Sequence, residues 1–247
     1  MPLCRRQTIA ALSCAALLLQ AAAVRAAAPK DLRDYAVYDF YVKGFRAGML
    51  VFAGVQAGDY YAVNGRFSSA GLMSLFRNVT YSATVRGTIA GGTYRPETYV
   101  LTTDAGKDHR VQTITYTNGV PAMPVEAPPH QRPPEALNPA TQGGTLDTLT
   151  ALYATLREMP QSKACNGTLT LFDGTRRAKL TLWPGDGATG TLACAGEYRR
   201  VAGYDAQDME HPVFPFRMTY APTSNGQVQV TEIDMQSIYG PAKLKRR

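Results

Sequence analysis

Histidines are the first candidates for acid–base chemistry, and the 247-residue sequence holds three of them, His109, His130 and His211. His109 follows a polar turn, His130 lies in a proline-rich stretch, and His211 directly precedes a proline. None stands in a G-x-S-x-G motif, and no two His or Cys residues have metal-ligand spacing. We therefore expect no catalytic residue, no metal site and no cofactor, and a protein that is not an enzyme.

Acidic residues gather at two places in the second half of the chain. Asp205, Asp208 and Glu210 form a cluster that lacks the regular spacing of a calcium loop, so we expect a solvated turn. Glu232 and Asp234 stand two residues apart, which places both on one face of a strand. Because glycosidase chemistry needs two acids set across a cleft, we expect this pair to face solvent.

Arginine doublets occur at residues 176–177 and 199–200. Successive residues of a strand point to opposite faces, so each doublet sends one side chain to each face of a sheet. An inward guanidinium would pair with a buried acid or with an anionic head group. We hypothesise that Arg177 and Arg200 line the polar end of an otherwise apolar concavity.

Residues 1–26 have the pattern of a cleaved secretory signal. Arg5 and Arg6 precede an Ala-rich apolar stretch, and small residues precede a cleavage point near Ala26. A membrane anchor would need about 20 strongly apolar residues, and this stretch is shorter and richer in alanine. We expect an exported protein with no transmembrane segment in the mature chain.

Cleavage leaves two of the four cysteines, Cys165 and Cys194. An even pair in an oxidising compartment indicates a disulfide. It would close a loop of about 30 residues, which stabilises the fold by roughly 3–4 kcal/mol. The alternatives are a zinc site, which lacks nearby further ligands, and a redox pair, which lacks a C-x-x-C motif.

The net charge of +7 does not indicate a polyanion-binding protein. Residues 1–26 carry three of the 26 basic residues, and residues 243–247 carry four. The remaining body holds 19 basic and 19 acidic residues, so we expect no nucleic-acid partner. We expect residues 243–247 to be a basic tail that is frayed and solvated.

Stretches rich in aromatic and β-branched residues alternate with turn signals along most of the chain, which predicts strands. The predicted strands cover residues 35–43, 49–55, 59–67, 79–89, 93–103, 110–117, 168–172, 177–183, 189–201, 214–221 and 227–238. The alternation changes phase within the last of these strands. That change indicates a bulge near Thr231.

Two helices and one irregular segment interrupt the strands. Residues 68–76 have a short run of apolar side chains at helical spacing, and residues 145–159 have the clearest apolar stripe of a helix. Residues 120–144 contain seven prolines and little apolar content. This composition predicts a proline-rich crossover loop, partly in the polyproline II conformation.

A sheet of ten or eleven strands must close, stack or curl to protect its edges. We predict a mainly β protein, with one curved antiparallel sheet (an open or half barrel) that clasps one helix, plus a short helix. A β-sandwich divided at the proline-rich loop is the alternative. The apolar candidates for a concave ligand lining, which an ordinary core would explain as well, are Tyr38, Phe40, Met49, Val51, Leu72, Leu75 and Phe76.

A set of motifs runs along the chain: YDFYVKGFRAGM at 38–49, AGL at 70–72, PATQGGTLD at 139–147, CNG at 165–167, LFDGxRR at 171–177, CAGEYRRVAGY at 194–204 and FPF at 214–216. Over residues 35–247 the chain resembles the alphaproteobacterial branch of the Domain of Unknown Function 3108 family. The resemblance implies an exported envelope protein and brings no catalytic residues. Because it spans the proline-rich loop, we expect residues 27–247 to form a single domain. Such proteins are similar to the curled sheets of the lipoprotein carriers of the Lol system, an analogy of fold alone.

These observations lead to an expectation about function. We expect a monomeric, non-enzymatic periplasmic protein of a Gram-negative bacterium that supports the cell envelope. It would act through a periplasmic protein partner or by binding an apolar or amphipathic envelope component, such as a lipid or lipoprotein. A lipid or lipoprotein carrier is the alternative, and a hydrolytic enzyme is less favoured.

Overall fold

The computed structural model describes residues 31–71, 78–187 and 190–247. The expected signal segment, with its cleavage point near Ala26, lies outside the described residues, as do Leu72, Leu75 and Phe76. In the described parts of the chain, no helix is long and apolar enough to cross a membrane.

The described residues form one antiparallel sheet of 14 strands. The first group is β1 (Leu32–Val42), β2 (Phe45–Ala57), β3 (Tyr60–Ser69), β4 (Thr80–Ala90), β5 (Thr93–Ala105), β6 (Asp108–Thr117), β7 (Val120–Pro121) and β8 (Val125–Ala127). The second group is β9 (Gly167–Phe172), β10 (Arg177–Pro184), β11 (Ala193–Ala202), β12 (Val213–Pro222), β13 (Val228–Ser237) and β14 (Gly240–Arg246). The strand order is β7-β6-β5-β4-β3-β2-β1-β14-β13-β12-β11-β10-β9, and β8 also pairs with β6.

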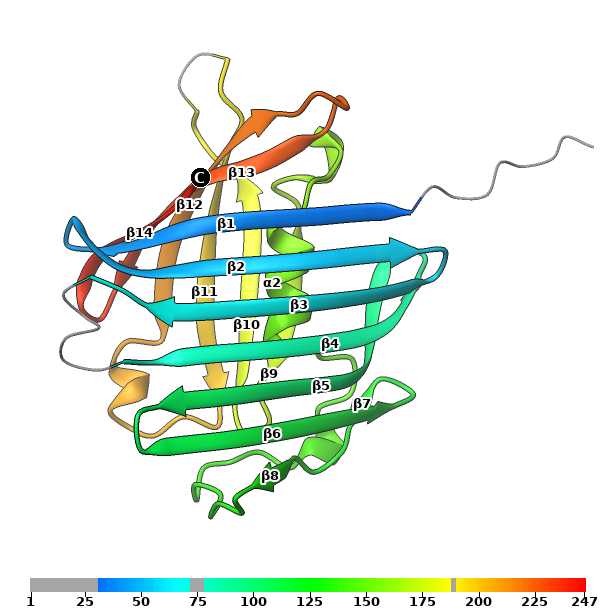
Figure 1. Cartoon of the computed structure of the whole chain (residues 1–247), viewed down its shortest axis with the longest axis vertical. Helices are drawn as coiled ribbons and strands as arrows, with labels where there is room; N and C mark the ends of the chain where they lie inside the picture. The colour runs from blue at the N-terminus through cyan, green and yellow to red at the C-terminus, as the bar shows by residue number, and fades with distance from the viewer. Residues whose placement is uncertain (1–30, 72–77, 188–189) are drawn as a thin grey trace, which may run out of the picture.

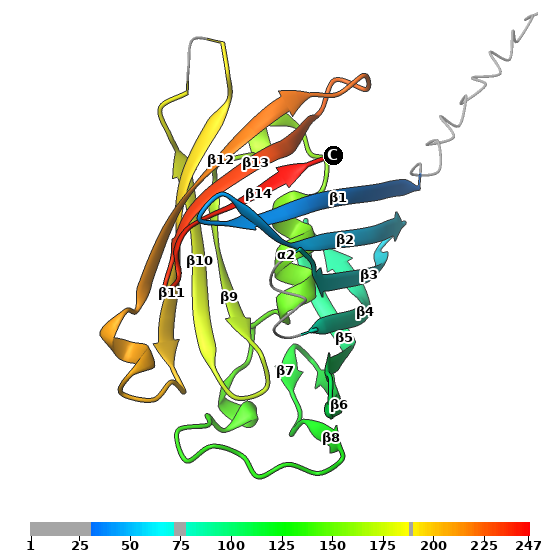
Figure 2. The same cartoon turned by 60° about the vertical axis from the view of Figure 1, so that its left-hand side comes forward.

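The sheet curls around one helix, α2 (Thr148–Leu156). Strands β1 to β6 form an N-terminal wall, strands β9 to β12 form a C-terminal wall, and α2 lies between the two walls (Figures 1 and 2). The hydrogen-bonded ladder continues from one wall to the other because β1 pairs with β14. The predicted curved sheet that clasps a helix is confirmed, and the two-part sandwich is not formed.

The predicted frayed tail is wrong, because residues 240–246 form strand β14 in the middle of the sheet. This strand pairs with β1 on one side and with β13 on the other. Ala242 is buried and Leu244 faces the concave side, whereas Lys243 and Lys245 lie on the convex side. The tail therefore joins the two halves of the sheet.

Helix α2 begins at the buried N-cap Asp147. Its carboxylate accepts hydrogen bonds from Thr150 N (2.8 Å) and from Thr150 Oγ1 (2.6 Å), which satisfies a free donor of the first turn. The helix ends at Leu156 because Arg157 has an extended backbone. The helix predicted over residues 145–159 is thus present but shorter at both ends.

Asp147 gives the fold an expected pH dependence. Burial raises the pKa of its carboxyl to about 6, against the opposing hydrogen bonds from Thr150. Between about pH 4 and pH 6 the folded state binds more protons than the unfolded state, so the free energy of unfolding falls as pH rises, by roughly 3 kcal/mol for this group. Asp147→Asn keeps an acceptor for the Thr150 amide and should remove this part of the slope. Urea unfolding at several pH values measures it, and equal slopes for the two proteins would contradict it.

Two glycines allow α2 to approach the N-terminal wall closely. A Cβ atom at Gly65 would lie 2.6 Å from Leu149 Cδ1, and a Cβ atom at Gly54 would overlap the Tyr153 ring. Gly65 lies on β3 and Gly54 on β2, so the helix packs where these two strands present no side chain.

Two connecting segments differ in part from prediction. The short helix predicted over residues 68–76 is wrong at its start, where Ser68 and Ser69 belong to β3, and residues 72–76 lie outside the described residues. The proline-rich residues 120–144 are irregular for most of their length. They also contain β7, β8 and the 3-10 turn η1 (Pro139–Thr141), and both short strands pair with β6.

The two remaining cysteines form a disulfide, as the sequence indicates. The Cα atoms of Cys165 and Cys194 lie 5.0 Å apart, and both residues are buried. Cys165 lies just after the 3-10 turn η2 (Gln161–Lys163), and Cys194 lies at the start of β11. The disulfide therefore ties the connection that follows α2 to the C-terminal wall.

Candidate functional site

An open apolar groove of about 300 Å³ lies between helix α2 and the concave face of the C-terminal wall. We refer to it as the groove. Almost all of its exposed lining is apolar. The lining side chains used below are Leu152 on the helix and Leu180, Tyr198, Phe214, Phe216 and Met235 on the strands.

A bulge in β13 gives the groove one of its walls. Thr219 pairs with Glu232 and the next residue, Tyr220, pairs with Val230, so Thr231 is the extra residue. The predicted bulge near Thr231 is confirmed. It lets Val230 point into the core while Ile233, on the opposite phase of the alternation, also faces inward and lines the groove.

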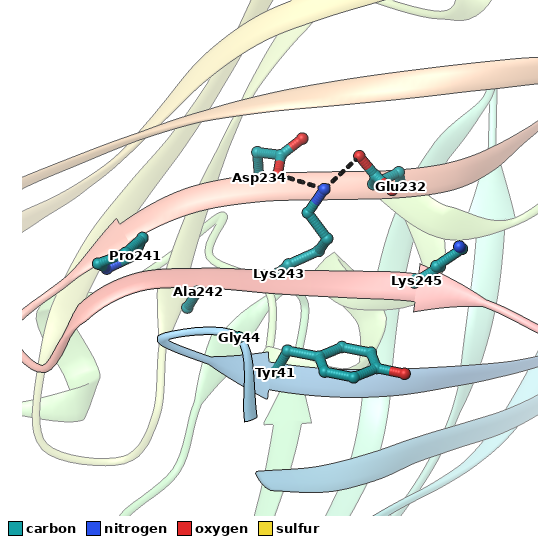
Figure 3. Close-up of a pocket in the computed structure, with 8 residues that line it drawn as sticks. All are labelled: Tyr41, Gly44, Glu232, Asp234, Pro241, Ala242, Lys243 and Lys245. Atoms are coloured by element: carbon teal, nitrogen blue, oxygen red, sulfur yellow. Dashed lines mark hydrogen bonds and ion pairs between the residues drawn. The ribbon is translucent and has the colours of Figure 1, made fainter. Parts of the chain in front are cut away.

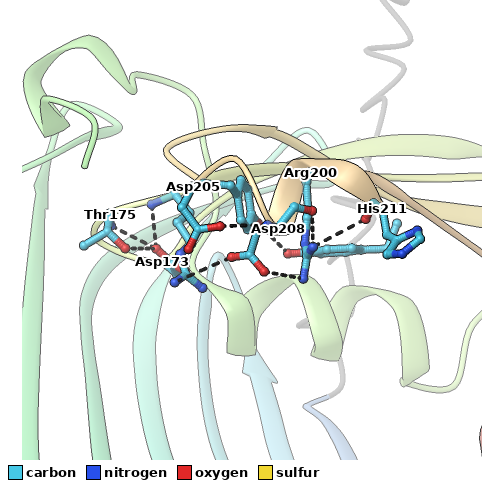
Figure 4. Close-up of polar contacts among 9 residues, drawn as sticks. Asp173, Thr175, Arg200, Asp205, Asp208 and His211 are labelled. Carbon is cyan, nitrogen blue, oxygen red and sulfur yellow. Dashed lines mark hydrogen bonds and ion pairs between the residues drawn. The ribbon is translucent and has the colours of Figure 1, made fainter. Parts of the chain in front are cut away.

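One end of the groove meets a cluster of rings and charges, which Figure 4 shows. The Arg200 guanidinium carbon lies 5.0 Å from the centre of the Phe214 ring and 5.3 Å from that of Tyr204. Arg200 Nη2 forms an ion pair with Asp208 Oδ1 at 3.0 Å, and Arg200 Nη1 donates to the backbone oxygens of Asp208 and His211. Arg200 thus holds the 3-10 turn η3 (Asp208–Glu210) against the sheet.

The two arginines predicted to line the concavity have different positions. Arg200 lies beside the groove, but its terminal nitrogens are bonded within the chain. Arg177 Nη1 donates to Gln142 Oε1 at 3.4 Å, away from the cluster. Arg176 occupies the position expected for Arg177, because its guanidinium lies 5.2 Å from the Tyr204 ring and 4.0 Å from Asp208 Oδ2.

A second cavity, of about 510 Å³, adjoins the groove at the C-terminal end of α2; we call it the side cavity. Thr155 and Leu180 line both spaces. The side cavity holds two cations, Arg157 and the exposed Lys163. Arg157 Nη1 donates to Glu158 O at 2.9 Å, while its buried Nε has no acceptor among the described residues. This cavity offers positive charge next to an apolar groove.

The described members of the predicted ligand lining do not lie in the groove. Tyr38 is wholly buried in the core and its hydroxyl donates to Val230 O at 3.0 Å. Phe40 packs edge to face on Phe67. Met49 and Val51 lie on the face of β2 opposite to Leu50, which does line the groove. The predicted Leu72, Leu75 and Phe76 lie outside the described residues.

A hollow of about 360 Å³ on the convex face involves the acidic pair of β13 (Figure 3). Lys243 Nζ lies 2.6 Å from Glu232 Oε1 and 3.0 Å from Asp234 Oδ1. These carboxylates raise the pKa of the Lys243 amine. The hollow is thus a neutralised patch of surface, and the acids face outward as expected.

The structure also places the histidines considered for catalysis. All three are exposed: His109 lies at the start of β6, and His130 and His211 lie in two separate connections. In the residues that the structure describes, no three His, Cys, Asp or Glu side chains gather closely enough to hold a metal ion. The concave face, with its groove, is the principal candidate for binding.

The fold and the groove define a mainly β protein with an apolar groove on its concave face. The chain belongs to the family described as a protein of unknown function (DUF3108), which matches residues 34–188. The matched region ends before β11, so the motifs at 194–204 and 214–216 lie beyond it. No curated protein matches the chain. A beta-barrel-like protein of Domain of Unknown Function DUF1849 from Brucella abortus is similar in structure, with 13% identity, a TM-score of 0.48, and coverage of 87% of this chain and 95% of that one.

Proposed function

We propose that this protein binds an anionic single-chain or acyl-chain amphiphile of the cell envelope in the groove, without catalysing a reaction. The apolar lining of the groove is the observation that carries the proposal. Apolar surface open to solvent is unfavourable unless a ligand covers it. A volume of about 300 Å³ lies at the lower end of the range for ligand sites, roughly 300–1,000 Å³, and suits one alkyl chain.

The side cavity supports the choice of an anionic head group. Arg157 and Lys163 lie there, and Lys163 forms no ion pair among the described residues. Thr155 and Leu180 line both the groove and the side cavity. An alkyl chain in the groove would therefore place its carboxylate or phosphate near these two cations. The buried disulfide supports a periplasmic location, where oxidising conditions maintain such bonds.

A charge placed in the groove should abolish this binding. Leu152 is half-buried and lines the groove, so Leu152→Glu should lower affinity for the fluorescent fatty acid cis-parinaric acid by about tenfold or more, because the carboxylate meets an alkyl chain. Met123→Glu is the matched control, since Met123 is 56% exposed on a loop outside the groove. Leu152→Trp fills the groove without a charge and should act in the same direction.

A second arm of the same titration tests the head-group site. Lys163→Gln should weaken cis-parinaric acid several-fold and leave the neutral probe N-phenyl-1-naphthylamine unchanged, because only the acid carries a charge. Circular dichroism checks that each variant is folded. The proposed function would be refuted if cis-parinaric acid showed no saturable binding to the wild-type protein. It would also be refuted if Leu152→Glu and Met123→Glu bound the acid with equal affinity.

A further inference from the structure

Two exposed hairpin turns lie side by side at one end of the sheet; we call them the hairpin tip (Figures 1 and 2). The β1–β2 turn carries Lys43 and Phe45, and the β13–β14 turn carries Ile238 and Tyr239. Lys43 N donates to Pro241 O at 2.8 Å, which holds the turns together. Phe45, Ile238 and Tyr239 are 65%, 57% and 69% exposed, so large apolar side chains project into solvent from both turns.

The β13–β14 turn does not require the two large apolar residues that it carries. Ile238 and Tyr239 occupy both loop positions between the paired Ser237 and Gly240. Neither has a positive φ, and Gly240 (φ 105°) takes the left-handed position, so the turn tolerates most residue types at 238 and 239. Ser237 Oγ closes the turn, since it accepts from Tyr239 N at 3.2 Å and donates to Gly240 O at 2.7 Å. Two large apolar side chains thus stand in solvent where neither the turn nor the core needs them, which indicates a role outside the fold.

Basic residues accompany these apolar side chains. Lys43 and Arg46 flank Phe45 on either side of the turn, and both are exposed. Lys43 forms no ion pair with any described residue, while Arg46 pairs with Asp39 at 2.7 Å. Exposed aromatic and aliphatic side chains beside cations are the combination that binds the interface of an anionic bilayer.

The tip also lies close to the groove along the chain. Met235, which lines the groove, stands opposite Phe216 and precedes Ile238 by three residues of the same hairpin. A membrane bound at the tip would thus lie near the groove. The tip residues themselves do not line the groove, so this inference goes beyond the proposed function and is tested separately.

We propose that the hairpin tip docks the protein on the surface of an anionic lipid bilayer. Phe45, Ile238 and Tyr239 enter the interface between head groups and acyl chains, and Lys43 contacts lipid phosphates. The partner is the bilayer itself, in contrast to the single amphiphile of the groove.

The test is the double variant Ile238→Asn with Tyr239→Gly, called the Asn-Gly variant. Asn and Gly are both ordinary turn residues, so the variant should keep the hairpin and unfold like wild type, while its partition onto phosphatidylglycerol-containing vesicles falls about tenfold or more. Tyr60→Ser is the matched control. Tyr60 is 67% exposed at the β2–β3 turn, at the other end of β2, and its loss should leave partition unchanged.

Vesicle flotation measures the partition, with neutral phosphatidylcholine vesicles for comparison. Wild-type protein should bind the anionic vesicles at least about tenfold more tightly than the neutral ones. The Leu152→Glu variant should float like wild type, and the Asn-Gly variant should bind cis-parinaric acid like wild type, which separates the two proposals. No flotation of wild type, or equal flotation of wild type and the Asn-Gly variant, would overturn the inference.

Discussion

A chain that ends at Tyr239, and therefore lacks β14, is expected not to form the curled sheet. β14 pairs with β1 from Val42 to Tyr38 and with β13 from Ser237 to Glu232, so its loss separates the two walls. Its removal also exposes the backbone donors and acceptors of two strands at once. The loss should exceed the whole stability of a typical domain, about 5–15 kcal/mol. Circular dichroism and urea titration should show no cooperative unfolding.

The matched control keeps the strand and removes its charge. Lys243→Gln with Lys245→Gln leaves Ala242 and Leu244 to pack inward. The ion pairs that Lys243 makes with Glu232 and Asp234 lie on the surface, and such pairs contribute about 0–1 kcal/mol. This double variant should unfold within about 1 kcal/mol of wild type. If the truncated chain has the same unfolding free energy as wild type, the last residues do not hold the sheet together and act as a frayed tail.

The alternation of residues 240–246 indicates a strand, whereas the composition of the last five residues indicates a solvated tail. Residues 240–246 read GPAKLKR, in which Ala242 and Leu244 alternate with Lys243 and Lys245. That alternation is typical of a half-buried strand. Four cations in the last five residues favoured a solvated terminus instead. The partner strand β1 lies about 200 residues away in sequence, and no local signal identifies such a pairing.

The general architecture was predictable because its signals are local. Turns, alternation and the helix stripe predicted most strands, the helix and the bulge near Thr231. The inward face of β2 was not predictable in this way, because residues 49–55 are apolar on both faces. Gly54 marks the inward face only through its contact with Tyr153, which is 99 residues further along the chain.

The arginine site shows the same limit. Alternation along β11 puts Arg200 on the side of Tyr198, as the sequence suggests. In β10 the register shifts between Arg177 and Ala178. The extra residue at this shift is Val201 of β11, so β10 itself alternates unbroken. Arg176 lies on the side of Leu180, which lines the groove, and reaches the Tyr204 ring, while Arg177 lies on the other face. Arg157 and Lys163 had no motif to identify them, since the packing of α2 brings them beside the groove.

Tyr153→Ala is expected to cost about 3–5 kcal/mol of unfolding free energy, because the side chain fixes α2 against the N-terminal wall. Tyr153 is wholly buried, and its ring packs edge to face on Phe52 and Tyr94 at centroid distances of 6.0 Å and 6.1 Å. Its hydroxyl donates to Asp34 Oδ2 at 2.6 Å. Burial and this carboxylate raise the pKa of the phenol, so it stays neutral and keeps donating at ordinary pH.

Tyr153→Phe separates packing from hydrogen bonding. The ring remains, and Asp34 still accepts from Glu158 N at 3.0 Å, so the cost should be about 1–2 kcal/mol. Urea unfolding measures both variants. Because α2 supplies one side of the groove through Leu152, the Ala variant should also lose cis-parinaric acid binding, whereas the Phe variant should keep it. If the unfolding free energy of Tyr153→Ala lies within about 1 kcal/mol of the wild-type value, this residue does not hold the helix. If Tyr153→Ala binds cis-parinaric acid as tightly as wild type, the groove does not depend on this residue.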